Sequence, residues 1–464
     1  MFSFITNLVS SAPAIYNISM YKLYPYFTND GSVGLYSEND NDIYHSTYGA
    51  LTEAYEKFIL PADIDFYIKN QHEIKILDIC YGIGYNSKSF LNFYLKKYFE
   101  SKKQHIGSIY TDNNLKEQNI DTIHTNNKYK EDLLNYNEKV YTNNVYMKNS
   151  PTLNIKNTNL KIYIKAIDTD KILALLSPFI ICNKKKLPEN YKLPFYNEKI
   201  SKMLNKPQKN QIEFSELINV IFFEKIAEKF PEIYKNQDIL NILANKDYRE
   251  LFEPFICRLF EVNKSRVCKH KPLMEITAFL HNIYYKYVSN RYKKALNSPI
   301  FNDFIFDIKI NDARMELLND NNMYNLIFLD AFTPAKCPAL WSIDFFKLLF
   351  KHLDYNGKIL TYSNSAAIRN AFIEAGFNVG KIYSTSQNKY TGTIAVKNKK
   401  FIKHKLSNYD LGLLKTKAGI FYRDENLNGQ NEAIIERHKI DVENSNLMSS
   451  SQYIKQYKKH TEAI

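Results

Sequence analysis

Residues 325–341 read Asn-Leu-Ile-Phe-Leu-Asp-Ala-Phe-Thr-Pro-Ala-Lys-Cys-Pro-Ala-Leu-Trp, an apolar run that stops at Asp330 and turns at once into proline-punctuated sequence. Proline cannot continue a central strand, because it lacks the N–H group that the ladder needs. The run is therefore predicted to be a buried parallel strand that ends near Asp330. The chain then leaves the sheet at its carboxyl edge, where open α/β folds bind ligands, so Asp330 is the first candidate functional residue.

A second strand-like run, residues 74–80, leads into Tyr-Gly-Ile-Gly-Tyr-Asn and then a helix-like segment at residues 87–98. Gly82 and Gly84 would let the backbone approach a ligand closely. Ser87 stands where the dinucleotide fingerprint needs its third glycine, and no phosphate-binding Gly-Lys-Ser/Thr follows. The loop therefore favours a nucleoside without a pyrophosphate over NAD or ATP. A tight strand-to-helix turn in some other α/β protein is the alternative.

The composition is that of a globular chain, with 464 residues, 45% hydrophobic and 24% charged. This length supports a full core plus an insertion or accessory unit. No apolar run reaches the roughly 20 residues that cross a bilayer, and the N-terminus lacks a secretory pattern, so we expect a cytoplasmic protein with no membrane segment. The cysteines include no Cys-x-x-Cys pair, which argues against a disulfide framework or a zinc knuckle. We expect reduced thiols and no metal.

The formal net charge of +13 indicates affinity for polyanions, through phosphate neutralisation and counterion release. Nucleic acid is the natural candidate partner. The alternative is compositional, because Lys, Asn, Ile and Tyr are all abundant, as an AT-rich genome would produce without selection for binding.

Beyond residue 72 strands alternate with helices, which predicts an α/β fold with a mostly parallel, doubly wound sheet. Residues 377–383 and 391–397 are joined by a polar loop too short for a helix, so an antiparallel strand is expected at one edge. The expected divisions are an N-terminal motif region, the first part of the sheet domain with a polar insertion at about 113–159, a mainly helical insertion, the second part of the sheet domain and a basic tail: 1–71, 72–182, 183–299, 300–400 and 401–464.

The second strand of the sheet has two candidates, residues 106–111 and residues 160–167, which end near Asp112 and Asp168. A plausible helix start at Asp170 favours the second. Within the helical insertion, periodicity marks helices at 213–230, 250–260 and 273–296, and their aromatic faces are interpreted as packing surfaces.

Several separated motifs resemble those of one family, the methyltransferase domain of the bifunctional tRNA 5-methylaminomethyl-2-thiouridine biosynthesis proteins. The most specific is Asp-x-Phe-x-Pro-x-Lys-x-Pro-x-x-Trp, which begins at Asp330. The others are Leu-Tyr-Ser at 35–37, Asp-Ile-Tyr-His-Ser at 42–46, Gly-Ala-Leu-x-Glu at 49–53, the Asp-to-Asn loop at 78–86, Asp-Ala-Arg at 312–314, Thr-Tyr-Ser at 361–363, Ile-Arg at 368–369 and Ala-Gly-Phe at 375–377. The resemblance covers residues 30–84 and 304–397.

The resemblance implies a class I methyltransferase-like fold that uses S-adenosylmethionine. The implied reaction methylates the exocyclic amine of a 5-aminomethyl group on the wobble uridine in the anticodon loop of tRNA. After Lys400 no strand-glycine-helix pattern for a flavin is found, so a stand-alone methyltransferase is expected. A separate oxidase acting on the same nucleotide is a further partner that the resemblance implies.

The implied site residues fall into three groups. Asp330 would orient the amine and stabilise the ammonium that forms, and Phe332 would pack against the methyl donor or the base. Cofactor contacts are expected from Tyr44, Glu53, Asp78, Gly82, Gly84, Asn86, Asp168 and Asp312. Phosphate contacts to the RNA are expected from Arg314, Lys336 and Arg369.

Two positions depart from the family pattern. Asn311 stands where the family usually carries glycine, and Ala166 lies near where a ribose-binding carboxylate would be expected, which leaves Asp168 or Asp112 for that role. Three alternative functions follow: an RNA-binding scaffold on a decayed methyltransferase fold, a methyltransferase for another amine or nucleobase, and an NAD-type oxidoreductase, which the missing third glycine disfavours.

Overall fold

The computed structural model describes residues 22–38, 42–45, 47–112, 160–180, 216–267 and 303–462. Its strands form two sheets, one of three strands and one of seven. The smaller sheet contains β1 (Leu23–Phe27), β2 (Val33–Ser37) and β3 (Asp42–Ile43). The larger sheet contains β4 (Glu73–Ile79), β5 (Lys161–Asp168), β6 (Phe304–Ile310), β7 (Tyr324–Leu329), β8 (Leu353–Thr361), β9 (Asn378–Ser384) and β10 (Lys389–Val396).

The larger sheet has the order β6-β5-β4-β7-β8-β10-β9, and every neighbouring pair is parallel except those of β10. This confirms the predicted α/β class with a mostly parallel, doubly wound sheet. The expected antiparallel pairing at one edge is also present, because β9 is the edge strand and pairs antiparallel with β10. Strand β10 lies one position inside the edge, between β8 and β9.

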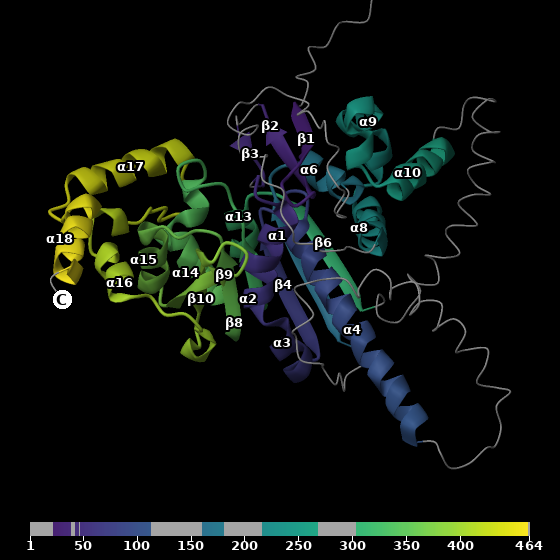
Figure 1. The fold of residues 1–464 in the computed structure, drawn as a ribbon. Coiled ribbons are helices and arrows are strands. Elements are labelled where there is room, and N and C mark those ends of the chain that lie inside the picture. The colour runs from purple at the N-terminus through teal and green to yellow at the C-terminus, as the bar shows by residue number, and fades with distance from the viewer. Residues whose placement is uncertain are drawn as a thin grey trace, which may run out of the picture.

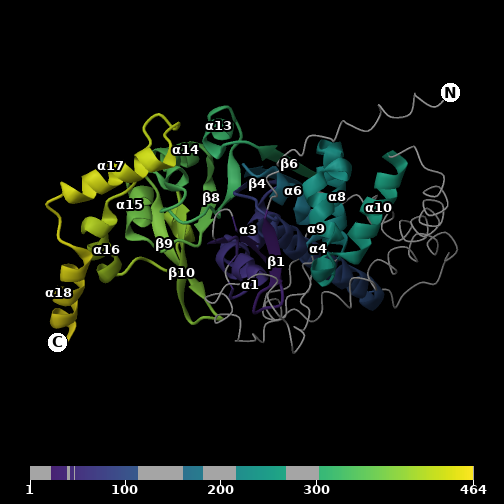
Figure 2. The ribbon, with the colours of Figure 1, turned by 90° about the horizontal axis from the view of Figure 1, so that it is seen from above.

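The sheet is buried on both faces, as shown by neighbouring residues of β4: Ile76 and Leu77 point to opposite sides and both are fully buried. Helices α13, α14 and α15 pack on one face, and α1, α4 and α8 on the other, where the π-helix η1 also contributes. Figures 1 and 2 show these two helical layers with the sheet between them.

The helical elements that flank the sheet are α1 (Ala50–Ala54), the π-helix η1 (Tyr55–Ile59), α2 (Leu60–Ala62), α3 (Ile64–Asn70), α4 (Tyr85–Asp112), α6 (Lys171–Leu176), η3 (Ser177–Phe179), α13 (Ala313–Leu318), η6 (Pro338–Trp341), α14 (Ile343–His352) and α15 (Ala366–Glu374). The structure decides between the two candidates for the second strand. Residues 106–111 belong to the end of helix α4, and β5 takes the strand position, which confirms the favoured candidate at residues 160–167.

The described part of the helical insertion belongs to the main core. It comprises α8 (Glu216–Lys229), η4 (Pro231–Lys235), α9 (Gln237–Ala244), η5 (Lys246–Leu251) and α10 (Pro254–Val267). Phe222 of α8 packs edge-on against Phe304 and Phe306 of β6, with ring centroids 6.0 and 4.8 Å apart. Helix α8 thus covers the parallel pair β5–β6. The polar insertion at 113–159 and the helix expected at 273–296 lie outside the described residues.

The carboxyl-terminal segment is folded, which corrects the prediction of a tail after residue 400. It contains η7 (Lys399–Phe401), α16 (Asn408–Leu414), η8 (Lys417–Gly419), α17 (Asn431–Glu443) and α18 (Ser450–Glu462). Leu414 and Ile434 are buried, and these helices lie at the end of the molecule opposite α8 to α10 (Figure 1). The sequence suggested a tail because the segment is rich in lysine and has few apolar residues, but those few pack against the rest of the protein.

Candidate functional site

A cleft of about 720 Å³ lies at the carboxyl edge of the parallel strands. Residues that follow β4, β5, β6, β7 and β8 line it, and β3 with the residues after it supplies another wall. Its volume is in the usual range for small-molecule sites. The predicted residues that line it are Tyr44, Glu53, Gly82, Asn86, Asp168, Asp312, Arg314, Asp330 and Phe332. Asp78, Gly84, Lys336 and Arg369 are not among the lining residues.

The loop after β4 has a backbone that only a few residue types accept. Cys80, Gly82 and Gly84 have φ values of 64°, 55° and 79°. A Cβ atom on Gly84 would lie 2.3 Å from the Tyr81 hydroxyl oxygen, so this position requires glycine for space as well as for conformation. Cys80 carries the same left-handed conformation with a side chain, a strain of about 1–3 kcal/mol that structures retain mainly at functional sites.

Asp168 holds the glycine loop from the end of β5. Its carboxylate accepts hydrogen bonds from the Gly82 N–H at 2.7 Å and the Asp170 N–H at 2.8 Å. Of the two candidates for the ribose-binding acid, Asp168 lines the cleft, whereas Asp112 ends the long helix α4. Ala166 is fully buried inside β5, two residues before the cleft. A carboxylate at position 166 would therefore point into the core.

Asp78 is fully buried beneath the same loop. Its Oδ2 accepts a hydrogen bond from the Ser87 hydroxyl at 2.5 Å, whereas Oδ1 has no hydrogen-bond partner. Burial raises the pKa of this carboxyl to about 7, against the opposing effect of the Ser87 hydrogen bond. Nε2 of His45, in the cleft wall, is a buried polar atom that also lacks a hydrogen-bond partner among the described residues. Because His45 lines the cleft, a polar ligand bound there could satisfy this atom.

Asp330 follows β7 directly and is only partly exposed, to the cleft. Asn86 donates a hydrogen bond from Nδ2 to its Oδ2 at 3.0 Å. Burial and the negative charge of Glu53 raise its pKa to about 7, while the Asn86 hydrogen bond and the charge of Lys57 oppose the shift. Glu53 and Lys57 form an ion pair one helical turn apart. Asp330 is thus a carboxyl that gains and loses a proton near neutral pH.

The proline-rich loop after Asp330 is held by two aromatic residues, the partly buried Tyr362 and the fully buried Trp341. The Tyr362 hydroxyl donates to the Ala331 carbonyl oxygen at 2.8 Å, and Nε1 of Trp341 donates to the Phe332 carbonyl oxygen at 2.7 Å. These bonds fix the loop so that the Phe332 ring lies against the Tyr44 ring, with centroids 5.1 Å apart. One aromatic wall of the cleft therefore joins two motifs that are almost 290 residues apart in the sequence.

Asp312 caps the helix α13, because its carboxylate accepts a hydrogen bond from the Arg314 N–H at 2.8 Å. The Arg314 guanidinium also binds both Asp312 carboxylate oxygens and, at 2.6 Å, the Asp424 carboxylate. Burial would raise the pKa of Asp312, but the Arg314 hydrogen bonds outweigh it and lower this pKa. The guanidinium of Arg314 is nearly buried and paired with two carboxylates, so in this structure it positions Asp312, and the predicted phosphate contact stays a prediction.

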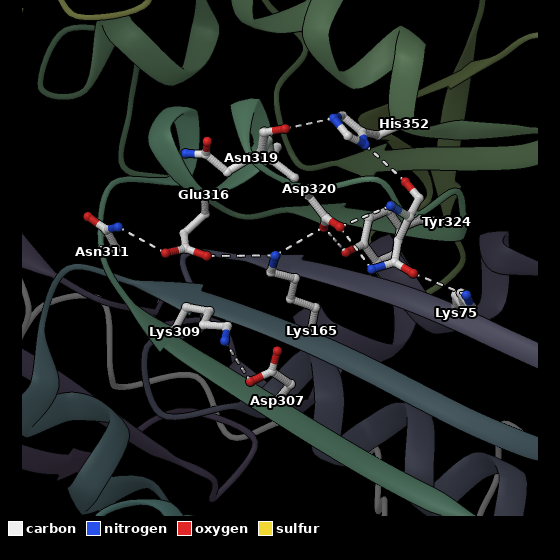
Figure 3. A network of polar contacts seen from close by, with 12 residues as sticks. Lys75, Lys165, Asp307, Lys309, Asn311, Glu316, Asn319, Asp320, Tyr324 and His352 are labelled. Carbon is white, nitrogen blue, oxygen red and sulfur yellow. Dashed lines mark hydrogen bonds and ion pairs between the residues drawn. The ribbon is translucent and has the colours of Figure 1, made fainter.

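A buried charge network fixes α13 to the sheet behind Asp312 (Figure 3). Asn311 donates from Nδ2 to Glu316 at 2.9 Å, and Lys165 of β5 pairs with Glu316 at 3.7 Å and Asp320 at 3.0 Å. Asn311 is absent from the described non-glycine residues with positive φ, so its position does not demand glycine. This departure from the family pattern is thus accommodated by the backbone and the network.

Arg369, the second arginine predicted to contact phosphate, is also paired inside the protein, and its phosphate contact stays a prediction. It is 6% exposed, and its guanidinium binds Thr393 at 3.0 Å, Asn364 at 2.8 Å and Asp410 at 3.3 Å. The group joins β10 to the carboxyl-terminal segment, away from the cleft lining. Lys336 has an exposed side chain that pairs with Asp42 at 2.7 Å, so a role toward the RNA stays a prediction there.

Several residues that line the cleft were not predicted to be part of the site. Tyr362 belongs to the Thr-Tyr-Ser motif at 361–363, and Lys57 lies four residues after the Gly-Ala-Leu-x-Glu motif at 49–53. The nearby motifs were the only sequence signal for these two residues. Asn431 of α17 had none, because only the fold brings this segment to the cleft. The other unassigned polar or sulfur-bearing residues of the lining are Asp42, His45, Cys80, Tyr81, Tyr85, Thr169, Asp170, Asn311, Thr333 and Cys337. Among the described residues no group of three or more His, Cys, Asp or Glu side chains is arranged to hold a metal ion.

Comparison with known proteins identifies part of this architecture. Residues 274–398 match the family model of an S-adenosyl-L-methionine-dependent methyltransferase. These residues include β6, β7, β8, β9, β10 and the loop of Asp330. The match confirms the predicted family resemblance and the predicted cofactor, S-adenosylmethionine. Within the described residues, no helix is long and apolar enough to cross a membrane.

Three relatives show how far the similarity extends. An uncharacterized protein of Methanocaldococcus jannaschii is 25% identical over 209 residues, which are 43% of this chain and 58% of that protein. The tRNA 5-methylaminomethyl-2-thiouridine biosynthesis bifunctional protein MnmC of Campylobacter fetus is 30% identical over 111 residues, 19% of this chain and 18% of that protein. The Burkholderia multivorans protein of the same name is 42% identical over 55 residues, 12% of this chain and 8% of that protein.

Among solved structures, the crystal structure of MNMC2 from Aquifex aeolicus is similar, with a TM-score of 0.48, 17% identity, and coverage of 93% of this chain and 88% of that chain. The chain spans little more than half the length of the first of the three relatives and under a fifth of the two bifunctional proteins.

Proposed function

We propose that this chain, which carries an S-adenosylmethionine-dependent methyltransferase domain, methylates an exocyclic amine on a nucleotide of tRNA, namely the 5-aminomethyl group of a modified wobble uridine. The MnmC proteins, whose printed name is that of tRNA 5-methylaminomethyl-2-thiouridine biosynthesis, share 30% and 42% identity with short stretches of this chain. The net charge of +13 also suits an RNA substrate. The proposal includes a cytoplasmic location and, as a further partner, an oxidase that acts on the same nucleotide.

The observation that carries the proposal is the position of Asp330. This carboxyl lies in the cleft at the end of β7, receives a hydrogen bond from Asn86 and has a pKa raised to about 7. An amine must be neutral at nitrogen to accept a methyl group, and the Asp330 carboxylate can orient it by accepting a hydrogen bond from its N–H and can stabilise the positive charge that develops on the nitrogen. The methylated ammonium then loses a proton, which a carboxylate with a pKa near the working pH is well suited to take.

The cofactor would be held by the elements at the other side of the cleft. The glycine loop offers its backbone, Asp168 offers a carboxylate to ribose hydroxyls, and Asp312 offers one to the adenine amino group. S-adenosylmethionine supplies an electrophilic methyl group when bound, so the chain has to align the amine and exclude water.

The target base would lie against the aromatic wall. Phe332 and Tyr44 form this wall, and Tyr362 lies further along the lining. A base drawn out of a single-stranded loop needs such apolar faces to replace the stacking that it loses. Glu53 and Lys57 lie beside Asp330, where their charges set its proton affinity and the orientation of the amine.

The test is methyl transfer to tRNA isolated from cells that lack the final methylation of this nucleotide. With S-adenosylmethionine present, nucleoside mass spectrometry should show the aminomethyl nucleoside converted to the methylaminomethyl nucleoside. Asp330→Asn serves as the catalytic control, since it keeps the size of the side chain and loses the basic oxygen. Binding of S-adenosylhomocysteine without any tRNA product would show a methyltransferase for another substrate. Failure to bind either cofactor form would favour the scaffold instead.

A further inference from the structure

We infer that an exposed aromatic cluster, made of Tyr383 and Tyr390 of the β9–β10 hairpin and of His404 from the segment after it, is a stacking surface for unpaired RNA bases next to the target nucleotide. This inference rests on the proposed function, because it assigns a second contact region for the same RNA. The cluster is separate from the lining of the cleft and takes no part in the chemistry described above.

The three rings form one continuous surface. Tyr383 and Tyr390 face each other across the strand pair, with ring centroids 5.4 Å apart, and His404 lies 6.0 Å from the first and 5.5 Å from the second. The two tyrosines remain 37% and 42% exposed. Large exposed aromatic rings held side by side are the usual platform on which single-stranded bases stack.

Cations surround this surface. The Lys381 ammonium lies 4.2 Å from the centroid of the Tyr390 ring, which makes that ring part of a cation–π pair. Lys389 directly precedes Tyr390, and Lys403 and Lys405 flank His404. These last three lysines are exposed and make no ion pair with a described residue. Long, unpaired lysine side chains are well suited to phosphates on either side of a stacked base.

The aromatic cluster lies near the cleft, at the carboxyl edge of the sheet. Strand β9 is parallel to the strands whose carboxyl ends form the cleft, so Tyr383 near its end lies at the same edge. Tyr362 of the cleft lining follows β8, and two residues later Asn364 donates from Nδ2 to the Tyr390 carbonyl oxygen at 3.3 Å. The cluster is thus one to two strand spacings, about 5–10 Å, from the strand end that reaches the cleft.

The hairpin is anchored to the helix that lines the cleft. Buried Glu56 of the π-helix η1 accepts hydrogen bonds from Ser384, Thr385 and Ser386, including one from the Ser386 N–H at 3.0 Å. Neighbouring residues of the same helical stretch, Glu53 and Lys57, face the cleft. Single π-helical turns are frequent at functional sites. One helix therefore fixes both the acid–base cluster and the hairpin, which sets the distance between the target base and its neighbours.

The experiment compares Tyr383→Ala/Tyr390→Ala with Tyr355→Ala in the full chain. Tyr355 is 65% exposed and lies near the amino end of β8, away from the carboxyl edge that forms the cleft. It is therefore the matched control. Fluorescence anisotropy would measure binding of an anticodon stem-loop RNA and of a fully paired duplex of similar length, in the presence of S-adenosylhomocysteine. We expect the double variant to bind the stem-loop about 5- to 100-fold more weakly, with little change for the duplex.

A conservative variant and a cofactor titration complete the test. Tyr383→Phe/Tyr390→Phe should bind the stem-loop like the wild type, because stacking needs the ring and not the hydroxyl. Wild-type affinity of the alanine double variant, or an equal loss for stem-loop and duplex, would overturn the inference. Calorimetric binding of S-adenosylhomocysteine by the same variants reports on the cleft alone, so a failure of the methyltransferase proposal would be seen separately from a failure of the stacking surface.

Discussion

Asp312 follows β6 and Asp330 follows β7 at the carboxyl edge of the same sheet, and both line one cleft, yet their surroundings differ. Asp312 is bound through both oxygens by the Arg314 guanidinium, which lowers its pKa. Among the described residues no cation binds Asp330 directly, and this carboxyl receives one amide hydrogen bond and has a pKa raised to about 7. Two carboxylates whose pKa values are driven apart can divide the work of a site. Asp312 is suited to permanent hydrogen-bond acceptance and Asp330 to proton transfer.

The largest expected effect, and the first test of the difference between Asp312 and Asp330, is on turnover. Asp330→Asn should lower kcat of methyl transfer by about 100-fold or more, because the amide cannot accept the proton of the amine. The measurement is single-turnover methylation of hypomodified tRNA at saturating cofactor. Near wild-type kcat would show that Asp330 only anchors the loop.

The contacts that hold Asp312 can be weakened by a substitution in the carboxyl-terminal segment, because Arg314 binds both Asp312 and Asp424. Asp424→Asn removes one partner of the nearly buried Arg314 and should lower the free energy of unfolding by about 2 kcal/mol. Urea denaturation measures it. The neighbouring Glu425→Gln is the matched control, because Glu425 pairs with Arg437 on the exposed surface and its loss should not be measurable. If both substitutions change the free energy of unfolding equally, the Arg314–Asp424 pair does not stabilise the structure around Asp312.

The pH dependence of turnover sharpens the role of Asp330. Its carboxylate must be ionised to accept a proton, so kcat should rise as the pH increases through about 7. Glu53→Gln removes a negative charge that raises the pKa of Asp330 and should move the inflection to lower pH, by less than about one pH unit. An inflection that stays in place, or moves upward, would exclude the stated coupling between these two acids.

The pH dependence of stability reports on the buried Asp78. Its pKa in the folded state, about 7, lies above the unfolded value of about 3.9, so the folded state holds the proton more tightly. The stability from this protonation is present below pH 4 and is lost as the pH rises toward 7. In thermal unfolding, Asp78→Asn should lose less stability than the wild type between pH 4 and 7. The remaining pH dependence would come from Asp330, whose pKa is also raised. An unchanged slope would show that Asp78 is ionised in the folded protein.

The sequence predicted the parts of this site that depend on local pattern. An apolar run that ends at an acid, and a strand that runs into glycines, are enough to place Asp330 and the Gly82 loop at one edge of a parallel sheet. The proline string after Asp330 also marked the loop that Trp341 and Tyr362 hold. These signals lie within a few residues of each other, so no knowledge of the fold is needed to find them.

Long-range pairing is what the sequence could not predict. Arg314 and Arg369 read as surface cations, because their partners Asp424 and Asp410 lie 110 and 41 residues further along the chain. Those partners belong to a segment whose lysine content indicated a tail, although a few apolar residues such as Ile434 dock it. The place of β10 inside the edge likewise depends on which side of β9 the hairpin folds, which the alternation of residues does not encode.

The most direct test of the division between the two acids is calorimetric titration with S-adenosylhomocysteine of the wild type, Asp312→Ala and Asp330→Asn, each checked for folding by thermal unfolding. Asp312→Ala should weaken cofactor binding about tenfold or more, because a charged hydrogen-bond acceptor is removed, while Asp330→Asn should bind like the wild type. Wild-type binding by Asp312→Ala together with loss of binding in Asp330→Asn would contradict the account.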